Sequence, residues 1–159
     1  MSSLEKEIHQ REFRNEYQKV LINIIHTNNY LVGKMNNVLK PYDITRQQYN
    51  VLRILRGQHP AHITVLEIRE RMLDKMSDAS RIVERLRRKE LVNRAFGSRD
   101  KRSVEVTITE AGLALLARME DDVNSLEKLF KHINVEEAMV LNESLDKIRT
   151  EKYSRQKKN

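Results

Sequence analysis

The segment Thr64–Arg94 decides the fold, and it reads TVLEIRERMLDKMSDASRIVERLRRKELVNR. Its hydrophobic residues recur at helical spacing in two short runs, which the four residues Leu73–Met76 separate. Thr64 and Glu67 have the spacing of a capping box, which predicts that the first helix covers Val65–Met72. Two short helices joined by such a connection are typical of a helix-turn-helix.

The second helix of this pair is predicted to begin at Ser77, which we expect to cap it, and to end near Lys89. In a helix-turn-helix, the first turns of the second helix reach base edges in the major groove of DNA. Arg81 and Arg85 lie one turn apart on the predicted exposed face, and arginine pairs bidentately with guanine, so we expect these two side chains to read bases. Ser77 and Ser80 are expected to hold phosphates or to cap the helix. The residues of this helix that are predicted to contact DNA are Ser77, Asp78, Ser80, Arg81, Arg85 and Arg88. The residues of both helices that are predicted to face the core are Leu66, Ile68, Ala79, Ile82, Val83 and Leu86.

The hydrophobic period changes after this helix, from helical to alternating. Leu91–Phe96 and Ser103–Thr109 are predicted to form the two strands of a hairpin. Between Arg81 and Arg102 the chain carries nine basic residues and three acidic ones. A basic helix followed by a basic hairpin tip suits the phosphate backbone of a duplex, so a nucleic acid is the favoured partner. A solvated surface is the alternative, and it stays open above all for the basic end of the helix, Arg87–Lys89.

Long helices are expected on both sides of this module. From Leu4 to Leu39 hydrophobic residues recur mostly at three- and four-residue steps, which predicts one helix of about 35 residues that Pro41 ends. Such a helix is longer than a small domain can cover by itself, and it therefore suggests a second chain packed along it. Further helices are predicted over Arg46–Arg56 after a capping box of Thr45 and Gln48, from Glu110 to Phe130, and after the capping pair Asn134 and Glu137.

The composition excludes several classes of protein and site. With 159 residues, 33% of them charged, and a net charge of +7, the chain is long enough for one basic domain. It has no Cys, which excludes disulfides, thiolate zinc sites and iron–sulfur clusters. No run approaches the roughly 20 apolar residues of a membrane span, and Met1–Gln10 lacks the apolar region of a secretory signal, so we expect a cytoplasmic protein without a membrane partner. No Gly-rich phosphate loop follows a strand and no pair of acids converges, so neither an enzyme nor a cofactor is expected.

The segment from Ile44 to Gly112 resembles the MarR family of winged helix-turn-helix transcriptional regulators. The resemblance rests on the pair of short helices, on Leu86-Arg87-Arg88-Lys89 followed by Leu91-Val92 and Arg94, and on Arg99-Asp100-Lys101-Arg102 followed by a strand and Thr109-Glu110-Ala111-Gly112. Two positions depart from the family pattern. Gly97 stands where the wing motif usually begins with Asp, and Glu90 stands where the family often has Gly at the end of the helix.

The resemblance implies a mainly α fold with a small antiparallel β-hairpin wing and dimerisation helices at both ends. The implied parts are an N-terminal dimerisation helix (1–40), a winged helix-turn-helix module (41–109), C-terminal dimerisation helices (110–151) and a basic tail (152–159). It also implies a homodimer on a palindromic operator of double-stranded DNA, with helix 77–89 in the major groove and wing 97–102 in the minor groove. Arg102 would make the minor-groove contact, Asp100 would brace its guanidinium, and Arg99 and Lys101 would lie near phosphates.

A small-molecule effector is a further implication of the resemblance. Family members typically bind phenolic or anionic ligands between the dimer helices and the winged module, and repression is their commonest mode, so we expect a repressor relieved by such a ligand. The residues near the expected hinge are His26, Tyr30 and Tyr42. A Tyr on an apolar helical stripe is more often part of the core, and that reading stays open for both tyrosines.

Two alternatives to this function stay open. His59 and His62, which flank Pro60 and Ala61, have a spacing that can chelate, and a metal-responsive regulator would use them, although their Pro-containing loop offers no helical face. The same basic charge would also serve a sequence-blind architectural protein. A-form RNA hides its major groove from a helix, so DNA is expected rather than RNA.

Overall fold

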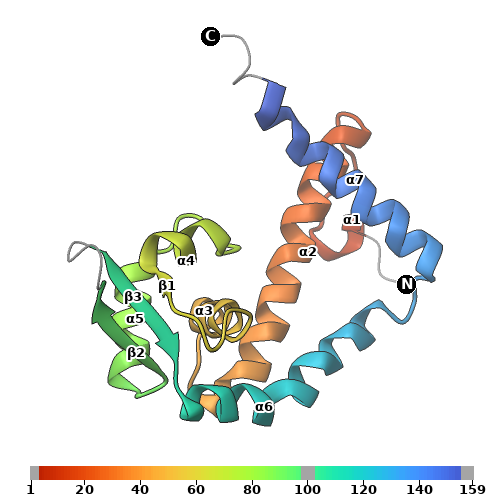
Figure 1. The fold of residues 1–159 in the computed structure, drawn as a ribbon. Helices are drawn as coiled ribbons and strands as arrows, with labels where there is room; N and C mark the ends of the chain where they lie inside the picture. Colours follow the sequence, from red (N-terminus) through yellow and green to blue (C-terminus); the bar gives the residue numbers. More distant parts are fainter. Residues whose placement is uncertain (1–3, 98–102, 155–159) are drawn as a thin grey trace. The chain divides into compact units, whose positions relative to one another are not determined.

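The computed structural model describes residues 4–97 and 103–154. These residues are mostly helical and include a three-stranded antiparallel sheet (Figure 1). They fall into two compact units, Met1–Val123 and Asn124–Asn159. The predicted fold class, mainly α with a winged helix-turn-helix, is confirmed. The helices are α1 (Leu4–Glu7), α2 (Glu16–Leu39), α3 (Arg46–Arg56), α4 (Val65–Arg71), α5 (Ala79–Arg88), α6 (Glu110–Asn124) and α7 (Val135–Ser154), with 3-10 turns η1 (Lys40–Tyr42) and η2 (Ser125–Phe130), and the strands are β1 (Ile63–Thr64), β2 (Val92–Phe96) and β3 (Val104–Ile108).

The N-terminal region forms two helices, so the prediction of one continuous helix from Leu4 to Leu39 is wrong. The chain leaves α1 through His9, whose φ of 54° lies in the left-handed region and cannot continue a right-handed helix. Asn15 then caps α2, because its side chain accepts a hydrogen bond from the backbone N–H of Gln18 at 2.9 Å. The predicted end of the helix before Pro41 is confirmed, since Pro41 lies in η1.

The sheet contains a strand that the hydrophobic pattern did not predict. Its strand order is β1-β3-β2, with both pairs antiparallel. The predicted hairpin is confirmed as β2 and β3, in which Val92 pairs with Ile108 and Phe96 with Val104. The additional strand β1 has only two residues, and Ile63 pairs with Val106. Two residues are too few for an alternating pattern, and β1 is recognisable only by its position beside β3.

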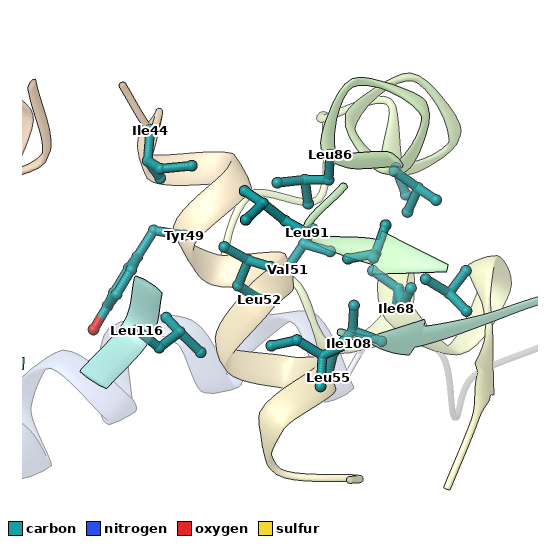
Figure 2. Close-up of a cluster of buried hydrophobic side chains, with 14 of the residues drawn as sticks. Ile44, Tyr49, Val51, Leu52, Leu55, Ile68, Leu86, Leu91, Ile108 and Leu116 are labelled. Atoms are coloured by element: carbon teal, nitrogen blue, oxygen red, sulfur yellow. The ribbon is translucent and has the colours of Figure 1, made fainter. Parts of the chain in front are cut away.

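The core of the first unit is built around α3. The side chains of Val51, Leu52 and Leu55 are completely or almost completely buried. Figure 2 shows them facing side chains from α4, α5, β3 and α6, including Ile68, Leu86, Ile108 and Leu116. Truncating a buried leucine in such a core costs roughly 2–5 kcal/mol of stability, so α3 fixes the positions of the elements around it.

Most of the predicted inner residues of the helix-turn-helix are in this core. Ile68, Ala79, Val83 and Leu86 are buried, and Ile82 packs partly buried against them. Leu66 is the exception, because 62% of its surface is exposed, so its prediction as a core residue is wrong. Leu66 is two residues before Ile68, the buried residue of α4, and therefore lies about 200° around the helix from it, on the outer side.

Local capping agrees with the sequence at three helix starts. Thr45 with Gln48 and Thr64 with Glu67 each form both hydrogen bonds of a capping box, which confirms the predicted starts of α3 and α4. In the second unit, the backbone N–H of Asn134 donates to Glu137 Oε2 at 2.8 Å and that of Glu137 donates to Asn134 Oδ1 at 2.9 Å, which confirms the predicted start of α7. The helix predicted from Glu110 to Phe130 is α-helical only to Asn124 and continues as the 3-10 turn η2. No helix in the described ranges has the length and hydrophobicity that a membrane span requires.

Candidate nucleic-acid interface

Helix α5 is fixed at its start by Asp78, and the prediction that Ser77 caps it is wrong. Asp78 Oδ1 accepts a hydrogen bond from the backbone N–H of Arg81 at 3.0 Å. Ser77 belongs to the preceding turn, where its hydroxyl donates to Asp74 Oδ2 at 2.7 Å. This hydrogen bond, together with one from the backbone N–H of Met76, holds the pKa of the Asp74 carboxyl below its usual value. Both Asp and Ser are good cap residues, and the sequence does not distinguish between two that are adjacent.

The outward face of α5 carries a row of polar and basic side chains. Ala79, Val83 and Leu86 face the core, so the predicted contact residues lie on the opposite side: Ser80, Arg81, Arg85 and Arg88 are all exposed, as is the cap Asp78, while Ser77 is partly buried. The side chains of Arg81 and Arg85 have no ion-pair partner in the described part of the chain. The two predicted base-reading guanidinium groups are therefore available to a ligand.

Glu84 lies on the same face, and its carboxylate collects three guanidinium groups. Glu84 Oε2 accepts from Arg87 Nε at 3.0 Å, and Oε1 accepts from Arg87 Nη2 at 2.9 Å and from Arg88 Nε at 3.3 Å. Arg94 Nη1, on the neighbouring strand β2, lies 3.8 Å from Glu84 Oε2. The hydrogen bonds and the positive charge of Arg87, followed by the single hydrogen bond and the charge of Arg88, hold the pKa of Glu84 at about 2, so this carboxylate is ionised at neutral pH.

This arginine cluster was not predicted from the sequence. The spacing of Glu84 to Arg87 and Arg88, three and four residues along a helix, was a signal for ion pairs on α5. The contact of Glu84 with Arg94 had no such signal, because it depends on how α5 packs against β2. Arg88, which was predicted to contact DNA, is shown in this cluster with its guanidinium in contact with Glu84.

Strand β2 of the hairpin packs against α5 (Figure 1). The two strands remain paired up to the tip, where the backbone N–H of Gly97 donates to the carbonyl oxygen of Ser103 at 3.0 Å. A hollow of about 620 Å³ lies beside the hairpin, α5 and the start of α4, and Ser80, Arg81 and Arg94 are among its lining residues. The predicted wing contacts Arg99, Asp100, Lys101 and Arg102 lie outside the described residues.

The end of α5 is joined to the end of the N-terminal helical region. Lys89 Nζ lies 2.6 Å from Asp43 Oδ2 and also donates to the Asp43 carbonyl oxygen. Asp43 ends η1 in a left-handed conformation, with φ of 54°. This ion pair connects the turn after α2 directly to the helix that carries the predicted DNA contacts.

The three predicted effector residues lie in separate local contacts. His26 Nε2 is 2.7 Å from Glu7 Oε2, and Tyr30 is half exposed with Lys34 Nζ 5.2 Å from its ring centre. The hydroxyl of Tyr42 donates to Asp122 Oδ2 at 2.6 Å, which raises the pKa of Tyr42. None of the three lines the groove of about 540 Å³ between α2, α3 and the turn after α4, whose lining includes Leu31, Met35, Arg46, Tyr49, Arg53 and Met72.

The metal-responsive alternative would use His59 and His62, and the described residues place no metal-binding cluster around this pair. His62 Nε2 lies 3.3 Å from Glu105 Oε1, and the peptide bond between His59 and Pro60 is cis. No group of three or more potential ligands that could hold a metal ion occurs within residues 4–97 and 103–154.

Comparisons with known proteins agree with this geometry. A model of the MarR family matches residues 42–103. The HTH-type transcriptional repressor IacR of Pseudomonas putida is 31% identical over 113 residues, and the alignment covers 70% of this chain and 66% of the length of IacR. A crystal structure of a cysteine-to-serine variant of MarR from E. coli complexed with operator DNA is 29% identical, with a TM-score of 0.71 over 92% of this chain and 99% of that chain.

A second DNA complex has the same fold. The MepR–DNA complex of S. aureus superposes with a TM-score of 0.74, covers 88% of this chain and 99% of that chain, and is 23% identical. At this identity the likeness shows the fold alone. The family match over the winged module and the similarity to E. coli MarR along most of the chain lead to one assignment. The chain belongs to the MarR family of transcriptional regulators.

Proposed function

We propose that the protein is a dimeric, sequence-specific DNA-binding regulator that represses transcription from a palindromic operator. The observation that carries this proposal is the pair Arg81 and Arg85, which are exposed on the outward face of α5 and have no ion partner among the described residues. The similarity to a MarR variant complexed with operator DNA supports DNA as the ligand, and the name of IacR, a transcriptional repressor, supports repression. Because the proposed target is chromosomal DNA, we expect the protein to be in the cytoplasm.

The proposed dimer is supported by an apolar stripe on α2. Tyr17, Leu21 and Ile25 recur at four-residue steps and are 86%, 58% and 54% exposed, and Val20 and Ile24 lie beside them. In the second unit, α7 also exposes apolar side chains, with Val135, Met139 and Val140 between 59% and 72% exposed. Apolar surface of this extent on helices is typical of an interface, and a two-fold dimer of winged modules reads half-sites about 34–36 Å apart.

The effector of the proposed repressor is a small phenolic or anionic molecule. The groove between α2, α3 and the turn after α4 has a volume of about 540 Å³, which is in the range of small-molecule pockets. Its lining is mostly apolar, and Arg46 and Arg53 supply positive charge for a carboxylate or phenolate. His26, Tyr30 and Tyr42 do not line this groove, and their role in effector binding remains a prediction.

In vitro selection of random duplex DNA at near-physiological salt tests the proposed function. We expect recovery of a palindrome whose half-sites are centred about one helical turn apart. The matched control is the double variant Arg81→Ala, Arg85→Ala, which should recover no motif while remaining folded by circular dichroism. Binding that is salt-sensitive but recovers no motif would instead indicate a sequence-blind architectural protein, and a motif recovered only with added Zn²⁺ would indicate a metal-responsive regulator.

A further inference from the structure

The basic residues of α5 and β2 fall into two groups according to Glu84. Arg87, Arg88 and Arg94 lie within 3.8 Å of the Glu84 carboxylate, and two of them donate hydrogen bonds to it. Arg81 and Arg85, on the same helix, have no ion partner in the described ranges. The two unpaired arginines lie at the predicted base-reading positions, whereas the paired ones lie toward the end of α5 and on the hairpin.

Pairing with Glu84 reduces the free energy that each of the three arginines can contribute when it contacts a DNA phosphate. A free guanidinium that contacts a DNA phosphate releases a condensed counterion. The resulting contribution to the binding free energy is independent of the DNA sequence. A guanidinium that already donates hydrogen bonds to a carboxylate must give up or share those hydrogen bonds to contact a phosphate. Its net contribution to the binding free energy is therefore smaller. The two hydrogen bonds of Arg87 to Glu84 are parallel and bidentate, the geometry that a phosphate would also offer.

The position of Glu84 adds a second effect. It is three residues after Arg81 and one before Arg85 on the outward side of α5. Together with Arg87 and Arg94 it also lines a second, smaller hollow of about 390 Å³ beside the hairpin. An ionised carboxylate at this place also repels a nearby phosphate, which lowers the attraction of the surrounding guanidinium groups for the DNA backbone. Binding by base contacts, in which Arg81 and Arg85 enter the groove, is affected less, because those side chains lie on the unpaired part of the face.

We infer that Glu84 is a specificity-determining residue, which occupies Arg87, Arg88 and Arg94 and so weakens binding to non-operator DNA relative to the operator. The inference rests on the proposed function, since it requires that the face of α5 meets DNA. The partner class affected is double-stranded DNA of arbitrary sequence, which competes with the operator throughout a chromosome.

The test compares Glu84→Gln with Asp121→Asn, which removes the same charge from an exposed position on α6. Affinity is measured for the selected operator and for a random-sequence duplex at several salt concentrations. For Glu84→Gln we expect affinity for the random duplex to rise roughly 3–10-fold, and the slope of log K against log salt to steepen by about 1–2. Affinity for the operator should rise less, so the ratio of the two affinities falls. Asp121→Asn should change the slope and the ratio little.

Two results would overturn the inference. One is a slope and a random-duplex affinity for Glu84→Gln that equal those of Asp121→Asn. The other is an equal loss of affinity on both duplexes, which would mean that Glu84 only positions α5. Failure of the proposed function has a different signature: the wild-type protein selects no sequence. In that case a later elution of Glu84→Gln than of Asp121→Asn from a heparin column still supports the release of the three arginines, and equal elution contradicts it.

Discussion

Thr109 Oγ1 donates a hydrogen bond of 2.8 Å to the backbone carbonyl oxygen of Glu90, and the same hydroxyl accepts one of 3.1 Å from the backbone N–H of Gly112. Thr109 therefore caps α6 and joins it to the turn that ends α5. In that turn Glu90 has a φ of 60°, the left-handed conformation that most L residues avoid. The position where relatives often have Gly is thus one where the backbone favours Gly.

Glu90→Gly is expected to stabilise the protein. Removing the Cβ relieves a left-handed conformation that costs an L residue roughly 1–2 kcal/mol, and the greater freedom of Gly in the unfolded chain offsets part of this gain. We expect a net gain of about 0.5–1 kcal/mol in the free energy of unfolding, measured by urea denaturation. Glu90→Ala is the matched control, since it removes the charge but keeps the Cβ. An equal gain in both variants would assign the effect to charge.

Gly112→Ala is expected to destabilise the protein, because Gly112 lies against neighbouring backbone. A Cβ at this position would be 2.4 Å from the carbonyl oxygen of Leu91 and 2.7 Å from Ile108 Cγ1. Forcing these groups apart should cost about 1–3 kcal/mol of the free energy of unfolding, as overpacking does in other cores. Gly57→Ala is the control, because its Cβ would meet its nearest atom, the carbonyl oxygen of Ile54, at an ordinary 3.5 Å. Equal stability of the two variants would show that the α6 start moves freely.

Local signals in the sequence predicted most of the helix-turn-helix, although not the cap of α5. Capping boxes place a side chain and a backbone group three residues apart, so Thr45 with Gln48 and Thr64 with Glu67 predicted the starts of α3 and α4 correctly. The change from helical to alternating spacing after Lys89 predicted β2 and β3 in the same way. These features depend on residues close together along the chain.

Features that depend on distant contacts were not predictable in this way. Strand β1 exists because Ile63 lies beside Val106, more than forty residues later. The break after α1 depends on the backbone of His9, and helical spacing of apolar residues continued across it. At the candidate site, the contact between Glu84 and Arg94 arises from the packing of a helix on a strand. Hydrophobic spacing therefore predicted the outward face of α5 but not which arginines on it are paired.

Arg81→Ala is expected to weaken operator binding by about 1–3 kcal/mol, since its guanidinium is proposed to pair with a base. The loss should be accompanied by relaxed specificity at one base pair in each half-site, which a panel of single-base operator variants measures. Arg118→Ala removes an exposed arginine from α6 and serves as the control. If Arg81→Ala weakens binding uniformly across the panel, its role is a phosphate contact and α5 reads bases through other residues.

Leu21→Asp is expected to dissociate the proposed dimer. Leu21 lies in the exposed stripe of α2 between Tyr17 and Ile25, and a carboxylate there would be buried without a partner when two copies pack together. Light scattering after size-exclusion chromatography should report a dimer for the wild type and a monomer for this variant. Asn23→Asp adds the same charge to an exposed position of α2 about 200° around the helix from Leu21, and it should remain dimeric. A wild-type protein that is monomeric at micromolar concentration contradicts the proposed assembly.

Glu67→Gln is expected to make stability less dependent on pH in the acid range. Glu67 Oε2 accepts hydrogen bonds from the backbone N–H of Thr64 at 2.7 Å and from its hydroxyl at 2.8 Å, and these lower the pKa of Glu67 below its usual 4.5. Because the folded state binds the proton less tightly than the unfolded state, the contribution to stability is complete above pH 4.5 and is lost as the pH falls toward the lower, folded value. Gln keeps a hydrogen-bond acceptor at the cap but does not titrate, so the urea midpoint of this variant should fall less steeply than that of the wild type as the pH falls below 4.5. Glu70→Gln removes an exposed carboxylate from the same helix without touching the cap, and its profile should run parallel to the wild type. Parallel profiles for wild type and Glu67→Gln would mean that the ionised cap does not stabilise the start of α4.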